Sequence, residues 1–340
     1  MQLTIHPYTL KLKETFTIAR GAYSERKVLF VGLSAAGKTG YGEAGEHEYY
    51  GVRIDDLLAG AEKLKPIVQG YAFDNPANFH EYIKPHCEGN TFLLAALDEA
   101  AHDLYGKLGN KPCFELWGWQ PEAAPKSCYT LPIDDPDTML RKLRETDFSI
   151  YKVKLGSSKD LEVMRMLRDN TDAILRVDAN CAWTVKEAID RSEKLAELKV
   201  EFIEQPLAHD NWEGMKELAR HSALPLIADE SCRTPDDLER CAEVFNGINI
   251  KLVKCGGPTA ALKMIKLARS LDLKIMGGCM VESSVAISAM AHLAPALDYL
   301  DIDGPLLLAN DPASGIRLDE QGGVHFNGKP GFGTDLLVQG

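Results

Sequence analysis

The chain has 340 residues, of which 45% are hydrophobic and 26% are charged, and its formal net charge is −12 at pH 7. This composition is typical of a globular protein with a substantial core, and the negative charge argues against a nucleic acid or an anionic membrane as partner. The sequence contains no run of about 18 apolar residues, so we expect no membrane-spanning helix. The eight cysteines form no C-x-x-C pair and the amino terminus lacks a signal-peptide pattern, so we expect reduced thiols and a cytoplasmic protein.

The first 118 residues are predicted to form an α+β unit of three strands followed by helices. Residues 2–18 alternate like a strand, and KVLFVGLSAAGKTGYGEA has the pattern of two strands joined by a turn. Helical periodicity begins at Asp55 and continues to Gly109. The segments ARGAYSER and GEHEYYGV are rich in polar residues, and we expect both to be loops, the first of them mobile.

One segment of this unit imitates a nucleotide-binding motif. Residues 32–39 (GLSAAGKT) fit the phosphate-loop pattern G-x-x-x-x-G-K-[ST] letter for letter. That motif requires a helix to begin at the Lys-Thr pair, so that the amino end of the helix faces the phosphates. The sequence GYGEAGEHE follows instead, with three glycines and no helical period. We therefore interpret the segment as a hairpin turn.

Residues 119–305 are predicted to form a (β/α)7β barrel, in which eight strands alternate with seven helices. Charged residues close several of the short apolar runs, and from Lys154 to Lys251 they are 24, 26, 25 and 22 residues apart. That spacing is the length of one strand, one loop and one helix. The carboxyl ends of barrel strands meet at one pocket, so these charged residues should converge there. Residues 306–340 are polar and rich in glycine, and we expect them to pack back on the first unit.

Three carboxylates in this repeat have the chemistry of a metal site. Asp178, Glu204 and Asp229 end successive predicted strands, so they should be neighbours at the rim of the barrel. Three oxygen ligands without Cys or His suit Mg²⁺ or Mn²⁺ and leave positions for substrate oxygens. A carboxylate of this kind can also cap the following helix, but three in register are poorly explained in that way. Asn180 faces the same way as Asp178 and is expected to support the ligands.

Three lysines in the same repeat are candidates for acid–base chemistry. Lys152 and Lys154 share one face of a strand, and Lys251 ends a strand across the ring. Cations close together beside a divalent metal should lower the pKa of at least one lysine and supply a neutral amine. One lysine would remove the α-proton of a metal-bound carboxylate, and the other would return a proton to the opposite face. The outcome is racemisation or epimerisation; the alternative is that the lysines only neutralise the carboxylates.

The segments KVKLG, VDAN, EQP, ADES and KLVKCGG together resemble the enolase superfamily, in its muconate-lactonizing subgroup, over essentially the whole chain. The resemblance implies an α/β architecture: a modified TIM barrel with a capping domain (residues 1–118) that the C-terminal tail (306–340) completes. It also implies roles for six residues, namely Asp178, Glu204 and Asp229 as Mg²⁺ ligands, Lys154 and Lys251 as the acid/base pair, and Lys152 as a contact of the substrate carboxylate and its enolate. Homo-oligomers are common among such barrels, so the resemblance allows one here.

The last predicted strand selects among the reactions of this subgroup. Asp301 and Asp303, in YLDIDGP, form a D-x-D that is similar to the dipeptide epimerases, where the pair binds the free α-ammonium of the dipeptide. Two carboxylates on the same face, opposite the metal, have the right charge for that group; an acidic loop in solvent is the alternative. The segment IMGGCMVES also resembles that family and places Cys279 and Met280 in the pocket. The resemblance thus predicts a Mg²⁺-dependent epimerase that inverts the α-carbon of the C-terminal residue of an L-Ala-L-Xaa dipeptide.

Several alternatives stay open at this point. N-acylamino-acid racemase and o-succinylbenzoate synthase share the fold, but neither substrate offers an ammonium group to the D-x-D pair. A Schiff-base lyase and a non-catalytic binding protein are alternatives of another class. In family members that act on Ala-Glu, an arginine of the first loop meets the Glu side chain, and Arg20 with Tyr23 is our candidate here. Whether Xaa is acidic or hydrophobic stays undecided, and we assign no role to His47.

Overall fold

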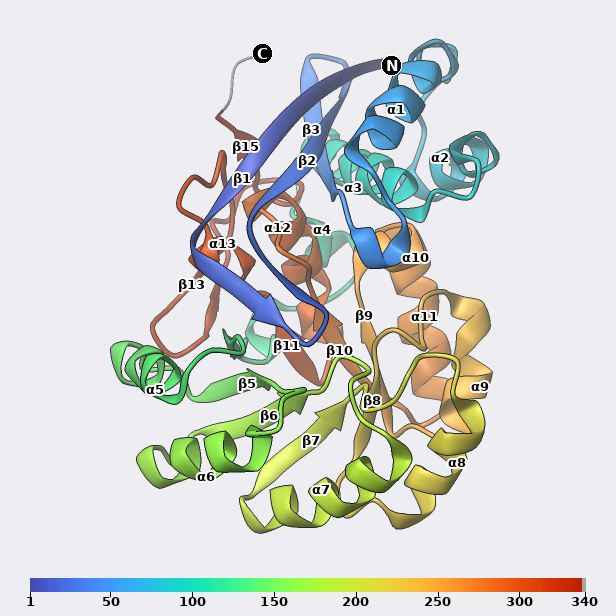
Figure 1. Cartoon of the computed structure of the whole chain (residues 1–340). Helices are drawn as coiled ribbons and strands as arrows, with labels where there is room; N and C mark the ends of the chain where they lie inside the picture. Colours follow the sequence, from blue (N-terminus) through green and yellow to red (C-terminus); the bar gives the residue numbers. More distant parts are fainter. Residues whose placement is uncertain (338–340) are drawn as a thin grey trace.

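The N-terminal part of the computed structural model, which describes residues 1–337, is an antiparallel sheet packed against helices (Figure 1). Its strands lie in the order β1-β2-β3, and the helices follow them in the chain. The bounds are β1 (Gln2–Ile18), β2 (Gly21–Ala35), β3 (Lys38–Gly45), α1 (Ile54–Gln69), α2 (Pro76–Ile83) and α3 (Thr91–Leu108). The predicted order of three strands followed by helices is confirmed.

Both faces of strand β2 are buried, which explains its continuous apolar run. Leu29, Val31 and Leu33 face the helices α1 and α3. Val28 and Phe30 alternate with them and pack on the opposite side, against the start of helix α12 and the C-terminal segment. The sheet is thus held between its own helices and the second half of the chain.

Two hairpin turns connect these strands. Ala36 and Gly37, between β2 and β3, both have positive φ, of 48° and 75°, which is the backbone of a two-residue hairpin turn. Lys38 begins a strand, so the phosphate-loop pattern is a hairpin turn, as predicted. The segment ARGAYSER is not the loop that we expected, because strand pairing continues through it: Ile18 pairs with Gly21 and Phe16 with Tyr23. Alternating polar residues on an exposed hairpin concealed this strand in the sequence.

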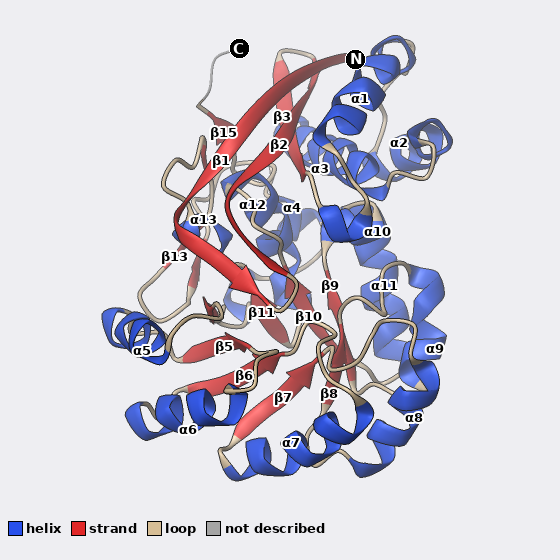
Figure 2. Ribbon diagram, in the orientation of Figure 1, coloured by secondary structure: helices blue, strands red, loops and turns tan. Residues whose placement is uncertain are grey.

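The second part is a barrel of eight parallel strands (Figure 2). They follow one another in chain order: β4 (Tyr129–Leu131), β5 (Ile150–Lys154), β6 (Ile174–Asp178), β7 (Val200–Glu204), β8 (Leu226–Ala228), β9 (Gly247–Ile250), β10 (Lys274–Gly278) and β11 (Tyr299–Asp301). The first and last strands meet where the N–H of Cys128 donates to the carbonyl oxygen of Leu300 at 3.0 Å. This contact closes the ring, and the predicted (β/α)7β fold is confirmed.

The connections between the strands form the outer ring of helices. These are α5 (Pro136–Glu145), α6 (Asp160–Asn170), α7 (Val185–Glu197), α8 (Trp212–His221), α9 (Leu238–Ala242), α11 (Pro258–Ser270) and α12 (Ser284–Leu293), with the single turn α10 (Leu252–Cys255) before α11. Helix α7 begins at a capping box, in which Thr184 and Glu187 each satisfy a backbone N–H of the other. Such local signals explain why helix positions could be read from the sequence.

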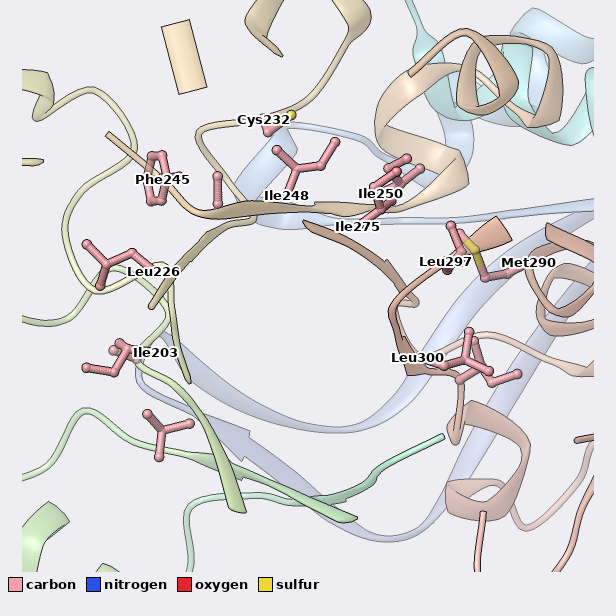
Figure 3. Packing of buried hydrophobic residues seen from close by; sticks show 14 of the residues in the cluster. Ile203, Leu226, Cys232, Phe245, Ile248, Ile250, Ile275, Met290, Leu297 and Leu300 are labelled. Atoms are coloured by element: carbon pink, nitrogen blue, oxygen red, sulfur yellow. The ribbon is translucent and has the colours of Figure 1, made fainter. Parts of the chain in front are cut away.

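Side chains alternate between the inside and the outside of the barrel. Ile203, Ile248 and Leu300 point outward from the ring of strands toward the helices, as Figure 3 shows. The inward-facing neighbours Phe202, Ile227 and Met276 form a small apolar layer that Tyr299 completes. A side chain two residues further along each strand faces inward again, one layer closer to the carboxyl ends. Charged residues in that layer therefore lie directly above the apolar layer of Phe202, Ile227 and Met276.

The segment after the barrel returns to the N-terminal sheet. The N–H of Ala309 donates to the carbonyl oxygen of Lys11, and the N–H of Phe332 donates to Asp103 of helix α3, both at 2.8 Å. Its elements are short: α13 (Gly304–Leu307), β12 (Ala313–Ser314), β13 (Arg317–Leu318), β14 (Val324–His325) and β15 (Asp335–Leu336). Within residues 1–337, none of the helices has the length and apolar character that crossing a membrane requires.

The contact between β3 and helix α3 depends on a glycine. A Cβ at Gly42 would overlap the carbonyl oxygen of Ala96, because the strand lies directly on the helix backbone. We predict that Gly42→Ala lowers the free energy of unfolding by about 1–3 kcal/mol. Gly45→Ala is the matched control on the same strand, since its Cβ would be in ordinary contact with two side chains, Val28 at 3.4 Å and Arg26 at 3.5 Å. Denaturant unfolding of both variants measures this difference, and equal stability would contradict the packing described.

Candidate active site

Three carboxylates lie side by side where neighbouring strands end. Asp178 is the last residue of β6, Glu204 is the last of β7, and Asp229 directly follows β8. One carboxylate oxygen from each lies within 4.8 Å of those from the other two, and all three side chains are buried. Ionised carboxylates this close together repel one another, and burial adds to the cost, so the site requires compensating cations.

Lysines flank this carboxylate triad on both sides. Lys154 Nζ donates to Asp178 Oδ2 at 2.6 Å, and Lys251 Nζ donates to Asp229 Oδ2 at 2.8 Å. Lys154 ends strand β5 and Lys251 follows strand β9, so the three carboxylate-bearing strands lie between them in the barrel. The two amines therefore approach the barrel mouth from different sides.

Lys152 lies deeper than the other two lysines. Its Nζ is 2.7 Å from Glu204 Oε2, 2.8 Å from Asp301 Oδ2 and 3.3 Å from Asp178 Oδ2, and its side chain is 1% exposed. It joins the triad to the last strand by ion pairs. Contact between Lys152 and a substrate carboxylate stays a prediction.

The buried carboxylates of the site control the protonation of these lysines. Burial alone would lower the pKa of Lys251, but the Asp229 carboxylate outweighs this and raises the pKa well above its ordinary value. The same holds for Lys152 beside Asp301 and Glu204. The physical reason is that each ammonium has a carboxylate at hydrogen-bond distance. The expected lowering of a lysine pKa refers to a site with a bound divalent cation, so it stays a prediction.

The oxygens of the site suit a hard divalent cation. Asn180 donates from its backbone N–H and from Nδ2 to Asp178, at 2.9 and 3.2 Å, while Asn249 Nδ2 donates to Glu204 at 2.8 Å. Among the residues that the structure describes, Asn180 Oδ1 is a buried oxygen without a hydrogen bond, and Glu204 Oε2 has the ion pair with Lys152 but no hydrogen bond. An unsatisfied buried oxygen beside three carboxylates, without Cys or His, gives the surroundings that Mg²⁺ prefers.

The two aspartates of the D-x-D sequence differ in their partners. Asp301 is ion-paired with Lys152 and accepts a further hydrogen bond from Thr130 Oγ1 at 3.4 Å. Asp303 Oδ2 accepts the backbone N–H of Thr130 at 2.6 Å, and it forms no ion pair within residues 1–337. Burial, followed by the nearby Asp301, raises the pKa of Asp303 to about 7. Asp303 is therefore a buried carboxyl without a cationic partner.

A cavity between the N-terminal hairpin and the barrel mouth, the central cavity, brings most of the predicted residues together. It is lined by Lys154, Asn180, Lys251, Cys279, Met280, Asp301, Asp303, Arg20 and Tyr23. The carboxylate triad and Lys152 are not among its lining residues. Asp178 and Asp229 contact the lining lysines Lys154 and Lys251, and Lys152 contacts Asp178. Residues spread over nearly 300 positions of the sequence thus face one space.

The hairpin tip is attached to the barrel through Arg20. Its guanidinium lies 2.6 Å from Glu230 Oε1 and donates to the carbonyl oxygen of Asn180 at 2.9 Å. The same guanidinium stacks 4.2 Å from the ring centre of Tyr49, whose hydroxyl is 3.0 Å from His209 Nδ1. Arg20 lies at the cavity, as predicted, but its charge is already balanced. Its contact with a substrate side chain stays a prediction.

Sequence reasoning missed three residues at this site. Lys254 Nζ contacts Asp229 Oδ1 at 2.6 Å and also donates to the carbonyl oxygens of Cys232 and Asn249. Glu230 directly follows Asp229 in the sequence. Its contact with Arg20 depends on the conformation of the loop after β8, which the sequence does not reveal. His47 lines the central cavity. The spacing of Lys254 from Lys251 was the one available signal, since a lysine three positions later on a helical turn faces the same way.

Comparison with known proteins agrees with this geometry. Residues 1–118 match the family described as mandelate racemase / muconate lactonizing enzyme, N-terminal domain, and residues 137–339 match enolase C-terminal domain-like. An L-Ala-D/L-amino acid epimerase of Maribacter sp. is 47% identical over 336 residues, which are 99% of each chain.

Solved structures of dipeptide epimerases have the same fold. The L-Ala-D/L-Glu epimerase of Bacillus subtilis, in a substrate-liganded complex, superposes with a TM-score of 0.93 at 26% identity, covering 100% of this chain and 99% of that one. A dipeptide epimerase of Cytophaga hutchinsonii, complexed with Mg and D-Ala-L-Val, has a TM-score of 0.93 at 28% identity, covering 99% and 95%. The chain therefore belongs to the mandelate racemase and muconate lactonizing enzyme family of the enolase superfamily.

Proposed function

We propose that the chain is a Mg²⁺-dependent dipeptide epimerase, which inverts the α-carbon of the C-terminal residue of an L-Ala-L-Xaa dipeptide. The observation that carries this proposal is the placement of two lysines, Lys154 and Lys251, on different sides of a buried carboxylate triad under one cavity. Two amines that approach one centre from different sides can remove a proton from one face and deliver one to the other. The relatives named as epimerases support the same conclusion.

Asp178, Glu204 and Asp229 would hold the metal ion, which supplies positive charge that acidifies the α-proton of a bound substrate carboxylate. Asn180 and Asn249 orient two of these ligands by hydrogen bonds, and Mn²⁺ is the alternative ion for the same oxygens. The structure of the Cytophaga hutchinsonii enzyme with Mg supports this assignment.

Lys154 and Lys251 would exchange the α-proton. In one direction the neutral amine of one lysine takes the proton from the α-carbon, and the ammonium of the other returns a proton to the opposite face. The reverse direction exchanges their roles, so each epimer meets its own base. Lys152, which stays cationic between Asp301 and Glu204, would stabilise the negative charge that develops on the substrate carboxylate.

The D-x-D residues would fix the other end of the dipeptide. Asp303 is buried and lacks a cationic partner among residues 1–337, so a free α-ammonium would supply the charge that it lacks. N-acylamino acids and o-succinylbenzoate precursors have no such cation and would leave this carboxyl unpaired. A Schiff-base lyase is less favoured, because each cavity lysine is ion-paired with a carboxylate.

We also propose that the chain is divided into a capping domain (1–118), a barrel (119–305) and a tail (306–340).

Binding of Mg²⁺ should depend on Glu204. We predict that Glu204→Gln weakens Mg²⁺ binding by about 100-fold or more, since a neutral amide replaces a charged ligand. Burial and the neighbouring Asp178 raise the pKa of Glu204 to about 7. A proton therefore competes with the metal below that pH, and the affinity of the wild type should fall as the pH drops from 8 to 6.

Titration calorimetry measures this affinity, with the exposed Glu193→Gln as a control of equal charge change. Unchanged binding in Glu204→Gln would show that the metal site lies elsewhere.

Replacement of Asp303 should affect the activity on free dipeptides much more than the activity on N-acylated dipeptides. We predict that Asp303→Asn lowers kcat/KM for epimerisation of an L-Ala-L-Xaa dipeptide by about 100-fold, because the ammonium loses its counter-charge. The amide oxygen can still accept the N–H of Thr130, so the fold should persist. Activity on the N-acetylated dipeptide, however low, should change little.

Circular dichroism or NMR follows the inversion of the dipeptide's α-carbon. Asp272→Asn, at an exposed position, is the control for the loss of one negative charge. Equal losses on both substrates would argue against an ammonium site at Asp303.

A further inference from the structure

Gln205, which directly follows Glu204, lies where the loops that carry the carboxylate triad meet. Its backbone N–H donates to the carbonyl oxygen of Ile227, two residues before Asp229, at 2.9 Å. Its carbonyl oxygen accepts the N–H of Cys181, in the loop after β6, at 2.8 Å. The residue is fully buried and does not line the central cavity. Gln205 therefore contacts the chain beside each of the three carboxylates without facing the cavity.

The backbone of Gln205 has a conformation that few residues other than glycine adopt. Its φ is 36°, in the left-handed region, and the φ of its partner Cys181 is 67°. A backbone of this kind is strained, and it persists where the surrounding contacts fix it. The side chain of Gln205 supplies contacts that do so.

The carboxamide of Gln205 uses its full hydrogen-bonding capacity within these loops. Its Oε1 accepts the backbone N–H groups of Asp229 and Ser231, at 3.0 and 3.1 Å. Its Nε2 donates to the carbonyl oxygen of Leu207 and to Ser231 Oγ, both at 2.9 Å. Because a backbone N–H can only donate, these contacts determine which end of the carboxamide is the oxygen. Two donors and two acceptor positions are what a glutamine side chain offers.

These bonds fix the backbone of residues 229–231, on which two contacts of the site depend. Asp229 is a member of the carboxylate triad. Glu230 forms the ion pair with Arg20 that attaches the N-terminal hairpin to the barrel. Because Asp229 and Glu230 are neighbours in the chain, a shift of this short segment would move both contacts together.

We propose that Gln205 is a positioning residue, which directs Asp229 toward the metal ion and Glu230 toward Arg20 by holding the backbone of residues 229–231. The role rests on the proposed function, in which the triad binds Mg²⁺. Gln205 itself is not a ligand in this proposal, because both ends of its carboxamide are already bonded to the protein. It acts on the metal site and on the hairpin through one segment of backbone.

Two variants of similar volume separate the acceptor of Gln205 from its donors. Gln205→Met removes every hydrogen bond of the carboxamide, whereas Gln205→Glu keeps an acceptor for the N–H groups of Asp229 and Ser231. We expect the Kd for Mg²⁺ to rise by about 10–100-fold in Gln205→Met and by less than about threefold in Gln205→Glu. Titration calorimetry measures both values. Gln205→Asn, whose carboxamide is one methylene too short to reach both N–H groups, should resemble Gln205→Met and gives a second variant if methionine prevents folding.

The hairpin provides a readout that requires neither metal nor substrate. We expect amide hydrogen exchange in residues 16–23 to become at least about threefold faster in Gln205→Met, because Glu230 no longer holds Arg20. Arg20→Gln should have a similar effect alone and add little to Gln205→Met, since both changes break the same ion pair. Exchange followed by mass spectrometry measures these rates.

Asp103→Asn is the matched structural control. Asp103 is equally buried and accepts the N–H groups of Tyr41 and Phe332, between the N-terminal sheet and the C-terminal segment. This variant should lower the free energy of unfolding and leave both the Mg²⁺ affinity and the exchange of the hairpin unchanged.

The outcomes distinguish the role of Gln205 from the proposed function. Unchanged Mg²⁺ affinity in Gln205→Met, equal losses of affinity in Gln205→Met and Gln205→Glu, or hairpin exchange at the wild-type rate would overturn the role and leave the epimerase proposal intact. Loss of Mg²⁺ affinity in Asp103→Asn would also overturn it, because lower stability alone would then explain the effect. A wild type that binds no Mg²⁺ would overturn both proposals.

Discussion

The site depends on the balance of charge inside the barrel mouth. Four buried carboxylates face four lysines there, and every one of these lysines lies within 3.3 Å of a carboxylate oxygen: the acids are Asp178, Glu204, Asp229 and Asp301, and the lysines are Lys152, Lys154, Lys251 and Lys254. When all eight groups are ionised, their charges sum to zero. A bound divalent cation would give the barrel mouth a net positive charge. A substrate that carries one negative charge on its carboxylate and develops a second at its α-carbon would restore neutrality. The site would therefore be electrostatically complementary to the reacting substrate when the metal is bound.

The barrel supplies the precision that this balance requires. Alternation along each strand places Phe202 and Ile227 two residues before Glu204 and Asp229, so that an apolar layer lies directly beneath the charged one. Few water molecules can reach the charges from that side, and the ion pairs are correspondingly strong. The N-terminal hairpin covers the other side, and the Arg20–Glu230 ion pair attaches it there. The charged residues at the strand ends are therefore shielded from solvent on both sides.

Much of this arrangement could be predicted from the sequence, because it follows from period and spacing. Residues such as Asp178 and Lys251 follow short apolar runs at nearly constant intervals, and a βα repeat places strand ends on one rim whatever the details of the loops. The barrel, its closing order and the clustering of the triad are confirmed for this reason. Asp301 and Asp303 could be placed at the cavity by the same argument.

The features that could not be predicted depend on loop and hairpin geometry. Polar residues mask the alternation in residues 19–26, so the sequence predicts a mobile loop where the structure has a paired hairpin. The partnership of Arg20 with Glu230 joins residues more than 200 positions apart, and no local pattern indicates it. The raised pKa of Lys251 depends on a hydrogen bond to Asp229 that the spacing alone does not fix. These contacts follow from the conformation of loops and side chains, which the spacing of the strands does not determine.

The measurement that tests the central claim most directly is exchange of the α-proton in D₂O with Mg²⁺, followed by NMR for Lys154→Ala and Lys251→Ala. The account predicts that neither variant inverts the substrate, and that each still exchanges the α-proton of one epimer, with opposite epimers for the two variants. Lys266→Ala, on the surface of helix α11, should behave as the wild type. Exchange of both epimers by both variants, or exchange of the same epimer by each, would contradict the two-base mechanism.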